Sequence, residues 1–488
     1  ALDTALVTNG KPAAVLCHAD VPAWREAAGV IQAAIKDATG VELPLLTDAQ
    51  LTPEQADAQH VILLGHLDNN RHVARLYHNF FDCLDVGYTG RKGYEIRSVH
   101  DPFGRGHNYL LVGGSCPEGT RLGAQAFADL VKATGKPGAL TLGRLLELKF
   151  DPNDRQEKAV APLTDAQRDA AIEAARMALF SPGEGRSGVS RMLDFAVRYH
   201  RTGDLRQAEA YKALLLALME YYATDEYITA TGLARYDRDF RDSWAHGVAV
   251  TWDLLEETGL FSDAERLAVT NYLIRLGLEC VLYQGWDRPE TLQRWRANTD
   301  IVHNHNTFPA LGVYFVGNYL KRHYGKPRPG EGEAPAEPVR QPARPAARQE
   351  PRPPGLGFVD DWLAVAHGIF NGQKHSSKPL EDAAGYQWLP LLHTMVYSLA
   401  EGDRAFFDEG HAREAATVAM MVTDNGGFES AYGDHGGERG SSGIGELLQR
   451  VAWYYGDPQA LWGARRTVDG PIPNNRDSMG QPYYVDLA

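Results

Sequence analysis

The segment NTDIVHNHNTFPALGVYFVGNYL, residues 298–320, places a short polar cluster directly in front of a long apolar run. The apolar part reads as a buried helix, and Pro309 is a residue that a first helical turn accepts. Asn306 or Thr307 is a suitable N-cap for such a helix. We therefore expect His303–Asn306 to lie at a helix N-terminus, where unpaired N–H groups and the helix dipole favour an anion.

Similar helical patterns occupy most of the chain on both sides of this segment. Successive amphipathic helices joined by short turns form hairpins, and enough of them close into a toroid. Residues 326–355 interrupt the pattern with a proline-rich stretch, which we interpret as a flexible insertion within the toroid, with a domain linker as the alternative. The sequence thus predicts an (α/α) toroid, an incomplete barrel, over residues 160–470. Its predicted helices are 164–180, 190–203, 205–223, 243–259, 263–283, 359–372, 386–402, 404–423 and 444–457.

The first 155 residues have a different pattern, in which short apolar strands alternate with helices. This alternation predicts a small α/β domain in front of the helices, so the fold class is multidomain α/β plus all-α. Gly113 and Gly114 follow one of the strands, but their spacing matches neither phosphate-binding glycine motif, and a tight turn is expected there.

Composition limits the classes of function that the chain can have. With 488 residues and a formal charge of -14, the chain is not expected to bind nucleic acid, because phosphate binding depends on Lys and Arg. No apolar run is long enough to span a membrane. The start of the chain, without an initiator Met, fits a mature secreted or periplasmic protein. The four cysteines are expected to be buried free thiols, with a Cys83–Cys116 bridge as the alternative.

Two segments resemble known families of carbohydrate-active enzymes. The strings GRKGYEIRSV (90–99) and NYLLVGGSCPEGTRLGAQAFADLV (108–131) are similar to the N-terminal accessory α/β domain of α-glucuronidases and hexosaminidases. The adjacent Asn304 and His305, which open a core helix of an all-helical region, resemble the neutralising pair of the alginate lyase and heparinase II/III-like polysaccharide lyases. In those families the accessory domain is structural, and the helical domain carries the active site.

The lyase resemblance implies β-elimination on a polysaccharide that contains uronic acid. In this chemistry a base removes the C5 proton, the C4 oxygen leaves, and the product is an unsaturated uronate. Asn304 and His305 would neutralise the sugar carboxylate and stabilise the enolate, with His303 and Asn306 as the alternative register. Tyr386, in EDAAGYQW, would be the base, the acid or both, and a phenol needs nearby cations for that role. Lys374, His375 and Lys378 are the candidate cations.

Further residues are candidates for contacts with the substrate. Arg294 and Arg296 precede the polar cluster and suit a sugar carboxylate. The glycine-rich loop at 426–443 is similar to a loop of heparinase-like enzymes, with His435 as a second acid or base and Arg439 as a carboxylate partner. A separate group near a predicted helix start, at 241–246, would line the cleft: Arg241, Trp244 and His246.

Two other classes of function compete with the lyase. An inverting glycoside hydrolase would need two carboxylates about 6.5–9.5 Å apart, for which the sequence offers Asp242, Glu381, Asp382, Glu429 and Asp434. A carbohydrate-binding protein without turnover is the third class, although the loops contain many titratable groups. No cofactor and no metal site are expected, and the expected partner is an anionic polysaccharide.

Overall fold

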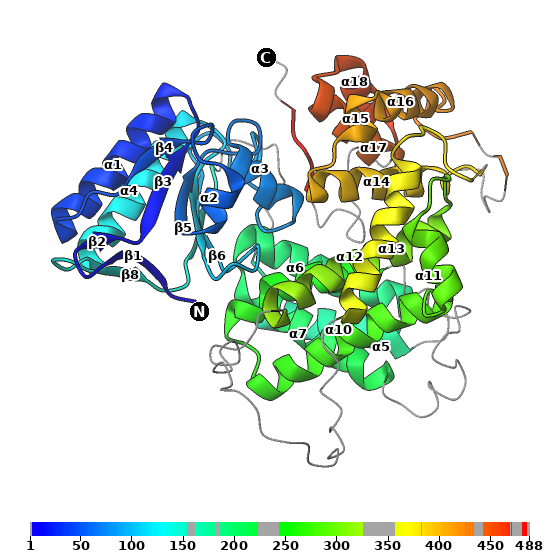
Figure 1. The fold of residues 1–488 in the computed structure, drawn as a ribbon, viewed down its shortest axis with the longest axis horizontal. Coiled ribbons are helices and arrows are strands. Elements are labelled where there is room, and N and C mark those ends of the chain that lie inside the picture. Colours follow the sequence, from blue (N-terminus) through cyan, green and yellow to red (C-terminus); the bar gives the residue numbers. More distant parts are fainter. Residues whose placement is uncertain are drawn as a thin grey trace, which may run out of the picture.

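The computed structural model describes residues 2–151, 153, 162–180, 185–222, 244–325, 357–381, 383–430, 432–433, 443–468, 470 and 481–485. These residues form an N-terminal sheet domain and a mostly helical remainder, as Figure 1 shows. The predicted combination of an α/β domain with a helical region is therefore confirmed.

The α/β domain is built on a mixed six-stranded sheet with the order β4-β3-β5-β7-β6-β9. The strands β4, β3, β5 and β7 are parallel, whereas β6 and β9 run antiparallel to their neighbours. A smaller antiparallel sheet has the order β2-β1-β8. The strands are β1 (Thr4–Thr8), β2 (Lys11–Pro12), β3 (Ala14–His18), β4 (Leu45–Thr47), β5 (His60–Leu64), β6 (Tyr94–Val99), β7 (Tyr109–Gly113), β8 (Leu140–Leu142) and β9 (Leu146–Lys149).

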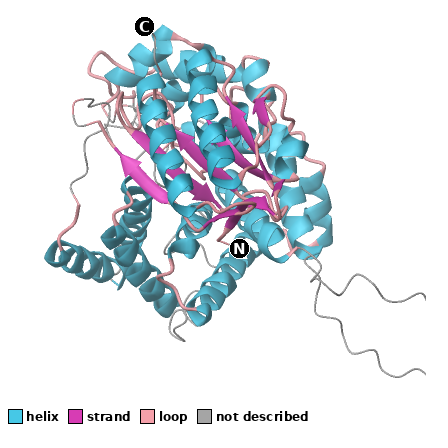
Figure 2. Ribbon diagram, turned by 90° about the vertical axis from the view of Figure 1, so that its left-hand side faces the viewer, coloured by secondary structure: helices cyan, strands magenta, loops and turns pink. Residues whose placement is uncertain are grey.

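Helices cover both faces of this large sheet. The long helices α1 (Pro22–Thr39) and α4 (Pro117–Thr134) pack together on one face (Figure 2). The short helices α2 (Pro53–Asp57) and α3 (Arg71–His78) belong to the other side. The N–H of Gly114 donates to Oγ1 of Thr120 (3.2 Å), so this turn directs that donor into the protein and not toward a phosphate.

The first group of helices forms a lobe with its own apolar core. Its central helix, α12, contacts α9, α10 and α13, and α5, α6 and α7 pack against one another beside them. We call this group the first helical lobe. Its helices are α5 (Asp165–Phe180), α6 (Gly185–Thr202), α7 (Leu205–Tyr222), α9 (Ala245–Leu255) with the 3-10 turn η2 (Glu256–Thr258), α10 (Asp263–Gln284), α11 (Pro289–Arg296), α12 (Asn304–Tyr324) and α13 (Gly357–Gln373).

The remaining helices form a second lobe, whose apolar core is continuous with one face of the sheet. Residues of β5 and α3, such as Leu63 and Leu76, belong to the same buried cluster as Leu392 and Leu447 of this lobe. Helix α14 also contributes Tyr397 to the core of the first lobe, so it joins the two. The helices are α14 (Trp388–Glu401), α15 (Ala405–Asp408), α16 (His411–Met421), α17 (Ile444–Tyr455) and α18 (Pro458–Arg466).

Several predicted helix boundaries are wrong for identifiable reasons. The predicted helix 404–423 is two helices, α15 and α16, because Gly410 has φ 90° and breaks the run between them. Helices α11 and α18 were not predicted; each is short, and each begins with a proline in its first turn. Short helices carry too few turns for a clear apolar period.

The C-terminal ends of several helices lie against the α/β domain. Arg97 of β6 contacts His200 near the end of α6, and Asn79 donates to the carbonyl oxygen of Ala400 in α14 (3.1 Å). Arg322 of α12 donates to the carbonyl oxygen of Pro102 (3.3 Å). The α/β domain thus packs on one end of these helices, and the N-terminal ends of α12 and α14 point away from it.

Candidate functional site

The polar cluster in front of α12 lies at the helix N-terminus, but the helix begins earlier than the sequence indicated. It starts at Asn304, and the N-cap is His303, whose Nδ1 accepts the backbone N–H of His305 (3.1 Å). The expected cap at Asn306 or Thr307 is therefore wrong. Pro309 is inside the helix, not in its first turn. An imidazole nitrogen can accept the orphan N–H as an Asn or Ser oxygen would.

Pro309 leaves the carbonyl oxygen of His305 without its normal helical donor, because that oxygen lies four residues before the proline. Gln284, the last residue of α10, replaces the missing donor: its Nε2 lies 2.6 Å from the His305 oxygen. The same amide accepts a hydrogen bond from Nδ2 of Asn306 (3.2 Å) through Oε1. One side chain thus fixes the backbone and one amide of this turn.

Asn304 differs from Asn306 in its contacts. It is only 6% exposed, and its Oδ1 is buried without a hydrogen-bond partner among the described residues. Its amide nitrogen likewise makes no hydrogen bond with the described part of the chain. A buried amide with unsatisfied polar atoms is costly, so it indicates a position prepared for a polar ligand.

The two imidazoles flanking Asn304 are half-buried. Burial lowers the pKa of His305, and burial together with the neighbouring His305 lowers the pKa of His303. Their ring centroids are 5.5 Å apart. Both rings are therefore neutral near pH 7 and can act as hydrogen-bond donors or acceptors at the positive end of the α12 dipole.

Tyr386 lies in the turn that leads into α14, and its side chain is 40% exposed. The turn is anchored on both sides: the N–H of Leu380 donates to the carbonyl oxygen of Val302 (2.8 Å), and the N–H of Ala384 donates to that of Tyr432 (3.0 Å). The segment carrying Tyr386 is therefore attached to the residue that immediately precedes His303.

A buried side-chain contact also joins the first turn of α12 to the second turn of α14. Oγ1 of Thr307 lies 2.7 Å from Nδ1 of His393, and the ring of Phe308 contacts the His393 ring with centroids 4.4 Å apart. Asn304 precedes Thr307 by one turn, and Tyr386 precedes His393 by two. The structure thus brings together the segments that carry the predicted Asn, His and Tyr.

Trp244 and His246 lie elsewhere. They are 2% and 1% exposed, and the His246 ring packs near Phe315, with centroids 6.1 Å apart. Phe315 follows Asn304 by eleven residues, which is roughly 16 Å along the helix axis. Both side chains pack within the first helical lobe, away from the N-terminus of α12, because α9 begins beside the middle of that helix.

The cations predicted to contact the substrate have partners of their own. Nζ of Lys374 lies 2.6 Å from Asp403, and Nδ1 of His375 lies 2.7 Å from Glu409. These two groups therefore bind carboxylates near α15. Arg296 pairs with Asp361, and the guanidinium of Arg294 lies 5.6 Å from the centre of the Trp295 ring.

Other predicted features lie outside the described residues. These are Arg241, His435 and Arg439 among the substrate and catalytic candidates, Asp242, Asp382 and Asp434 among the hydrolase carboxylates, and the insertion at 326–355. Of the other two carboxylates, Glu429 is 2% exposed and accepts the indole N–H of Trp388 (2.7 Å). That contact fixes the start of α14.

Sequence reasoning missed the side chains that support the site. Gln284, Gln373 and His393 come from three other helices; Gln373 accepts the N–H of Val302 through Oε1 (3.1 Å). One signal was present in the sequence, because Pro309 within a long apolar helix leaves a carbonyl that needs another donor. The identity of that donor could not be read from local pattern.

All four cysteines are free, as predicted: Cys17, Cys83 and Cys280 are buried, and Cys116 is half-buried. The described residues contain no cluster of three or more His, Cys, Asp or Glu side chains that could hold a metal ion. None of the described helices has the length and apolar character needed to cross a membrane. No protein-family model and no curated protein sequence matches this chain.

Proposed function

We propose that this protein is a polysaccharide lyase that cleaves a uronate-containing polysaccharide by β-elimination. The observation that carries the proposal is the buried amide of Asn304, which has no partner among the described residues and lies at the N-terminus of α12 between two half-buried imidazoles. A sugar carboxylate bound there would receive hydrogen bonds from neutral donors and the favourable end of a helix dipole.

Neutralising the carboxylate is what the elimination requires. The C5 proton becomes acidic only when the charge that develops on the adjacent carboxylate is stabilised, and prepositioned donors supply that stabilisation. In this scheme the amide of Asn304 and the ring of His305 contact the carboxylate. Asn306 is already held by Gln284, which favours Asn304 over Asn306 for this role.

Tyr386 is the proposed base and acid. It is 40% exposed, it lies in the turn that leads into α14, and that turn is joined to Val302. The phenolate would take the C5 proton, and the phenol so formed would give that proton to the leaving C4 oxygen. Of the cations expected beside it, Lys374 and His375 are paired with Asp403 and Glu409.

We also propose that the helices form an incomplete (α/α) toroid. Support comes from the succession of contacts, in which α6 packs on α9, α9 on α12, α12 on α14 and α14 on α17. Helices α7 and α18 each pack on one member of this series, and α10 and α13 each pack on two. An arrangement of that kind would gather the starts of the inner helices around one site.

The test is a continuous ultraviolet assay for the conjugated C4=C5 uronate product. The substrates are alginate, glucuronan, ulvan, hyaluronan, chondroitin and heparan chains. We expect absorbance to rise with at least one of them, Asn304→Ala to lower kcat roughly 10²- to 10³-fold, and Tyr386→Phe to abolish the signal.

The exposed residue Asn425 supplies the matched control, and Asn425→Ala should leave the rate unchanged. Reducing ends that appear without any rise in absorbance would replace the lyase by a glycoside hydrolase. Full activity of Asn304→Ala would remove the carboxylate site from the N-terminus of α12.

A further inference from the structure

An open groove of about 860 Å³ runs along one face of α13. Its polar lining consists of Arg296, His367, Asn371, Lys374, Glu401 and Asp403. From Ala364 to Lys374 the groove follows ten residues of helix, or roughly 15 Å. We call it the α13 groove.

Three small residues are part of the groove lining: Ala364, Gly368 and Gly402. Gly368 also lets the backbone of Trp295 and Arg296 approach α13, because a Cβ there would collide with it. A helix between two lobes normally presents large apolar residues to its neighbours. Its other face does so with Leu363 and Phe370, which are in the core.

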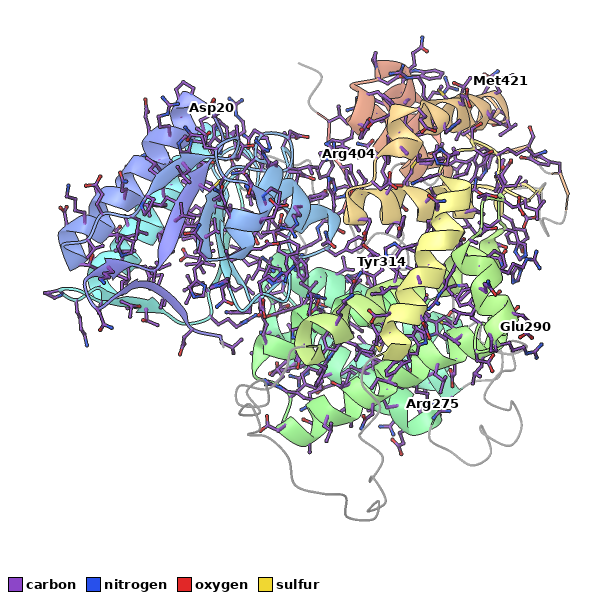
Figure 3. All side chains as sticks on the ribbon, viewed as in Figure 1. Asp20, Arg275, Glu290, Tyr314, Arg404 and Met421 are labelled. Carbon is purple, nitrogen blue, oxygen red and sulfur yellow. The ribbon has the colours of Figure 1, made fainter. Side chains whose placement is uncertain are left out.

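The polar groups of the groove are held in fixed positions by neighbouring residues. Nδ1 of His367 is hydrogen-bonded to the hydroxyl of Tyr397, whose ring stacks on Phe370 with centroids 4.4 Å apart. Glu401 accepts the hydroxyl hydrogen of Tyr314 (2.7 Å). Figure 3 labels Tyr314 at the junction of the lobes. Such preorganisation is typical of binding sites and lowers the cost of ordering on binding.

The tyrosine contact also favours one tautomer of His367. Burial raises the pKa of the Tyr397 phenol, which therefore stays protonated and can donate to Nδ1. The other ring nitrogen, Nε2, then carries the imidazole hydrogen, and no hydrogen bond from it to the described residues is present. The amide of exposed Asn371 likewise makes no hydrogen bond within the described chain.

The charges in the groove cancel. Two cations, Arg296 and Lys374, are matched by two carboxylates, Glu401 and Asp403, and Lys374 and Asp403 contact each other at 2.6 Å. An anionic ligand gains little from such a lining, because each attraction is opposed by a carboxylate nearby. A ligand with many hydroxyl groups can instead donate to the carboxylates and accept from the cations, His367 and Asn371.

We propose that the α13 groove binds a neutral, hydroxyl-rich sugar residue. The 296–302 loop connects the groove to His303, since Asn298 packs over Gly368 and Gln373 holds Val302. That this sugar belongs to the same chain as the uronate rests on the proposed function. The substrate would then be a mixed polysaccharide, with a neutral residue a short distance from the cleaved uronate linkage.

The test measures binding without turnover, on the full chain carrying Tyr386→Phe. Cellobiose, lactose and xylobiose are the neutral probes, and glucuronic and galacturonic acid are the acidic ones, each titrated by ligand-observed saturation-transfer NMR. We expect a neutral disaccharide to bind. Asn371→Ala should weaken binding of this disaccharide roughly fivefold, because one hydrogen bond is lost. Asn425→Ala should leave its affinity unchanged.

A second variant tests whether the disaccharide occupies the volume of the α13 groove. Ala364→Phe fills the groove without removing a polar group, and it should abolish binding of the neutral disaccharide while the unfolding midpoint stays close to that of the parent. The proposal is overturned when no neutral probe binds, when binding survives Ala364→Phe, or when only the acidic sugars bind.

The groove and the lyase proposal can fail separately. Neutral binding that is lost in Ala364→Phe, together with no ultraviolet product from any substrate, would keep the groove and reject the lyase. Ultraviolet product from a substrate, without binding of any neutral disaccharide, would keep the lyase proposal and reject the groove proposal.

Discussion

Oγ1 of Thr307 lies 2.7 Å from Nδ1 of His393, and both side chains are completely buried. This contact joins the first turn of α12 to α14, and it is flanked on one side by Asn304 and on the other by the turn that carries Tyr386. The geometry of the candidate site therefore depends on a hydrogen bond between residues that are 86 positions apart in the chain.

Replacing Thr307 by Val should destabilise the protein although the two side chains have the same shape. The hydroxyl also donates to the carbonyl oxygen of Asn304 (3.2 Å), and its loss leaves a buried polar group unpaired at a cost of about 1–3 kcal/mol. Urea unfolding measures the change. Thr307→Ser keeps the hydroxyl and should therefore lower the free energy of unfolding by less than Thr307→Val does. Equal decreases in the two variants would contradict the role of the hydrogen bond.

Gln284 and Pro309 should be energetically coupled. In the parent protein, Gln284→Met removes the donor to the His305 carbonyl and should lower the free energy of unfolding by about 1–3 kcal/mol. In a Pro309→Ala background, the restored backbone N–H can donate to the same carbonyl oxygen. Gln284→Met should then lower the free energy of unfolding by less than it does in the parent protein. A double-mutant cycle measures the difference, and additive losses would show that Gln284 does not replace the missing helical donor.

Stability should depend on pH through Asp85. Burial raises its carboxyl pKa to about 6, whereas an unfolded Asp titrates near 3.9. Between these values the folded state binds more protons than the unfolded state, so the free energy of unfolding falls as pH rises through that window. The full effect is roughly 3 kcal/mol, and it is constant above about pH 6.

Asp85→Asn isolates this contribution. The amide oxygen can still accept the N–H groups of Gly87 and Tyr88, each 3.0 Å from Oδ1, but the residue no longer titrates. Urea unfolding at several pH values from 4 to 7 should give a difference between the two proteins that shrinks toward low pH. Parallel curves would mean that Asp85 titrates normally.

Arg97 should be essential for the contact between the α/β domain and α6. It pairs with Glu95, which is fully buried, and its Nη1 lies 2.9 Å from Nδ1 of His200. Arg97→Met leaves that carboxylate without a counter-charge and should cost about 3–5 kcal/mol. Adding Glu95→Gln removes the stranded charge, so the double variant should be more stable than the single one by urea unfolding. The reverse order would contradict the ion-pair interpretation.

Only one cysteine should react with a thiol reagent in the native state. Cys116 is half-buried, with Sγ donating to the carbonyl oxygen of Arg91 at 2.8 Å. Burial raises the pKa of Cys17 to about 12, and Cys83 and Cys280 are also buried. Titration with a chromogenic disulfide should detect one fast thiol, none in Cys116→Ser, and all four in denaturant.

The sequence predicted the elements whose pattern is local. Helix α10 was expected at residues 263–283 and is Asp263–Gln284, because a Ser cap, an apolar period and a terminal Gly all lie within the segment. The alternation of strands and helices in the first 155 residues likewise led to the observed sheet domain. The location of His303–Asn306 at a helix N-terminus followed from the apolar run behind it.

Contacts between distant segments were decided only by the tertiary structure. The sequence grouped Trp244 and His246 with the candidate site, but α9 packs beside the middle of α12 and buries both residues there. It offered Lys374 and His375 as cations near Tyr386, whereas the folded chain pairs them with carboxylates of another segment.

The same division applies to the proposed uronate site and to the α13 groove. The amino acids around residue 304 by themselves determined that a polar helix start exists, because helix capping and hydrophobic periodicity act over a few residues. Gln284, His393 and the α13 groove come from helices far apart in the chain. Only packing decides which faces of those helices meet, since helical periodicity defines a face but not its neighbour.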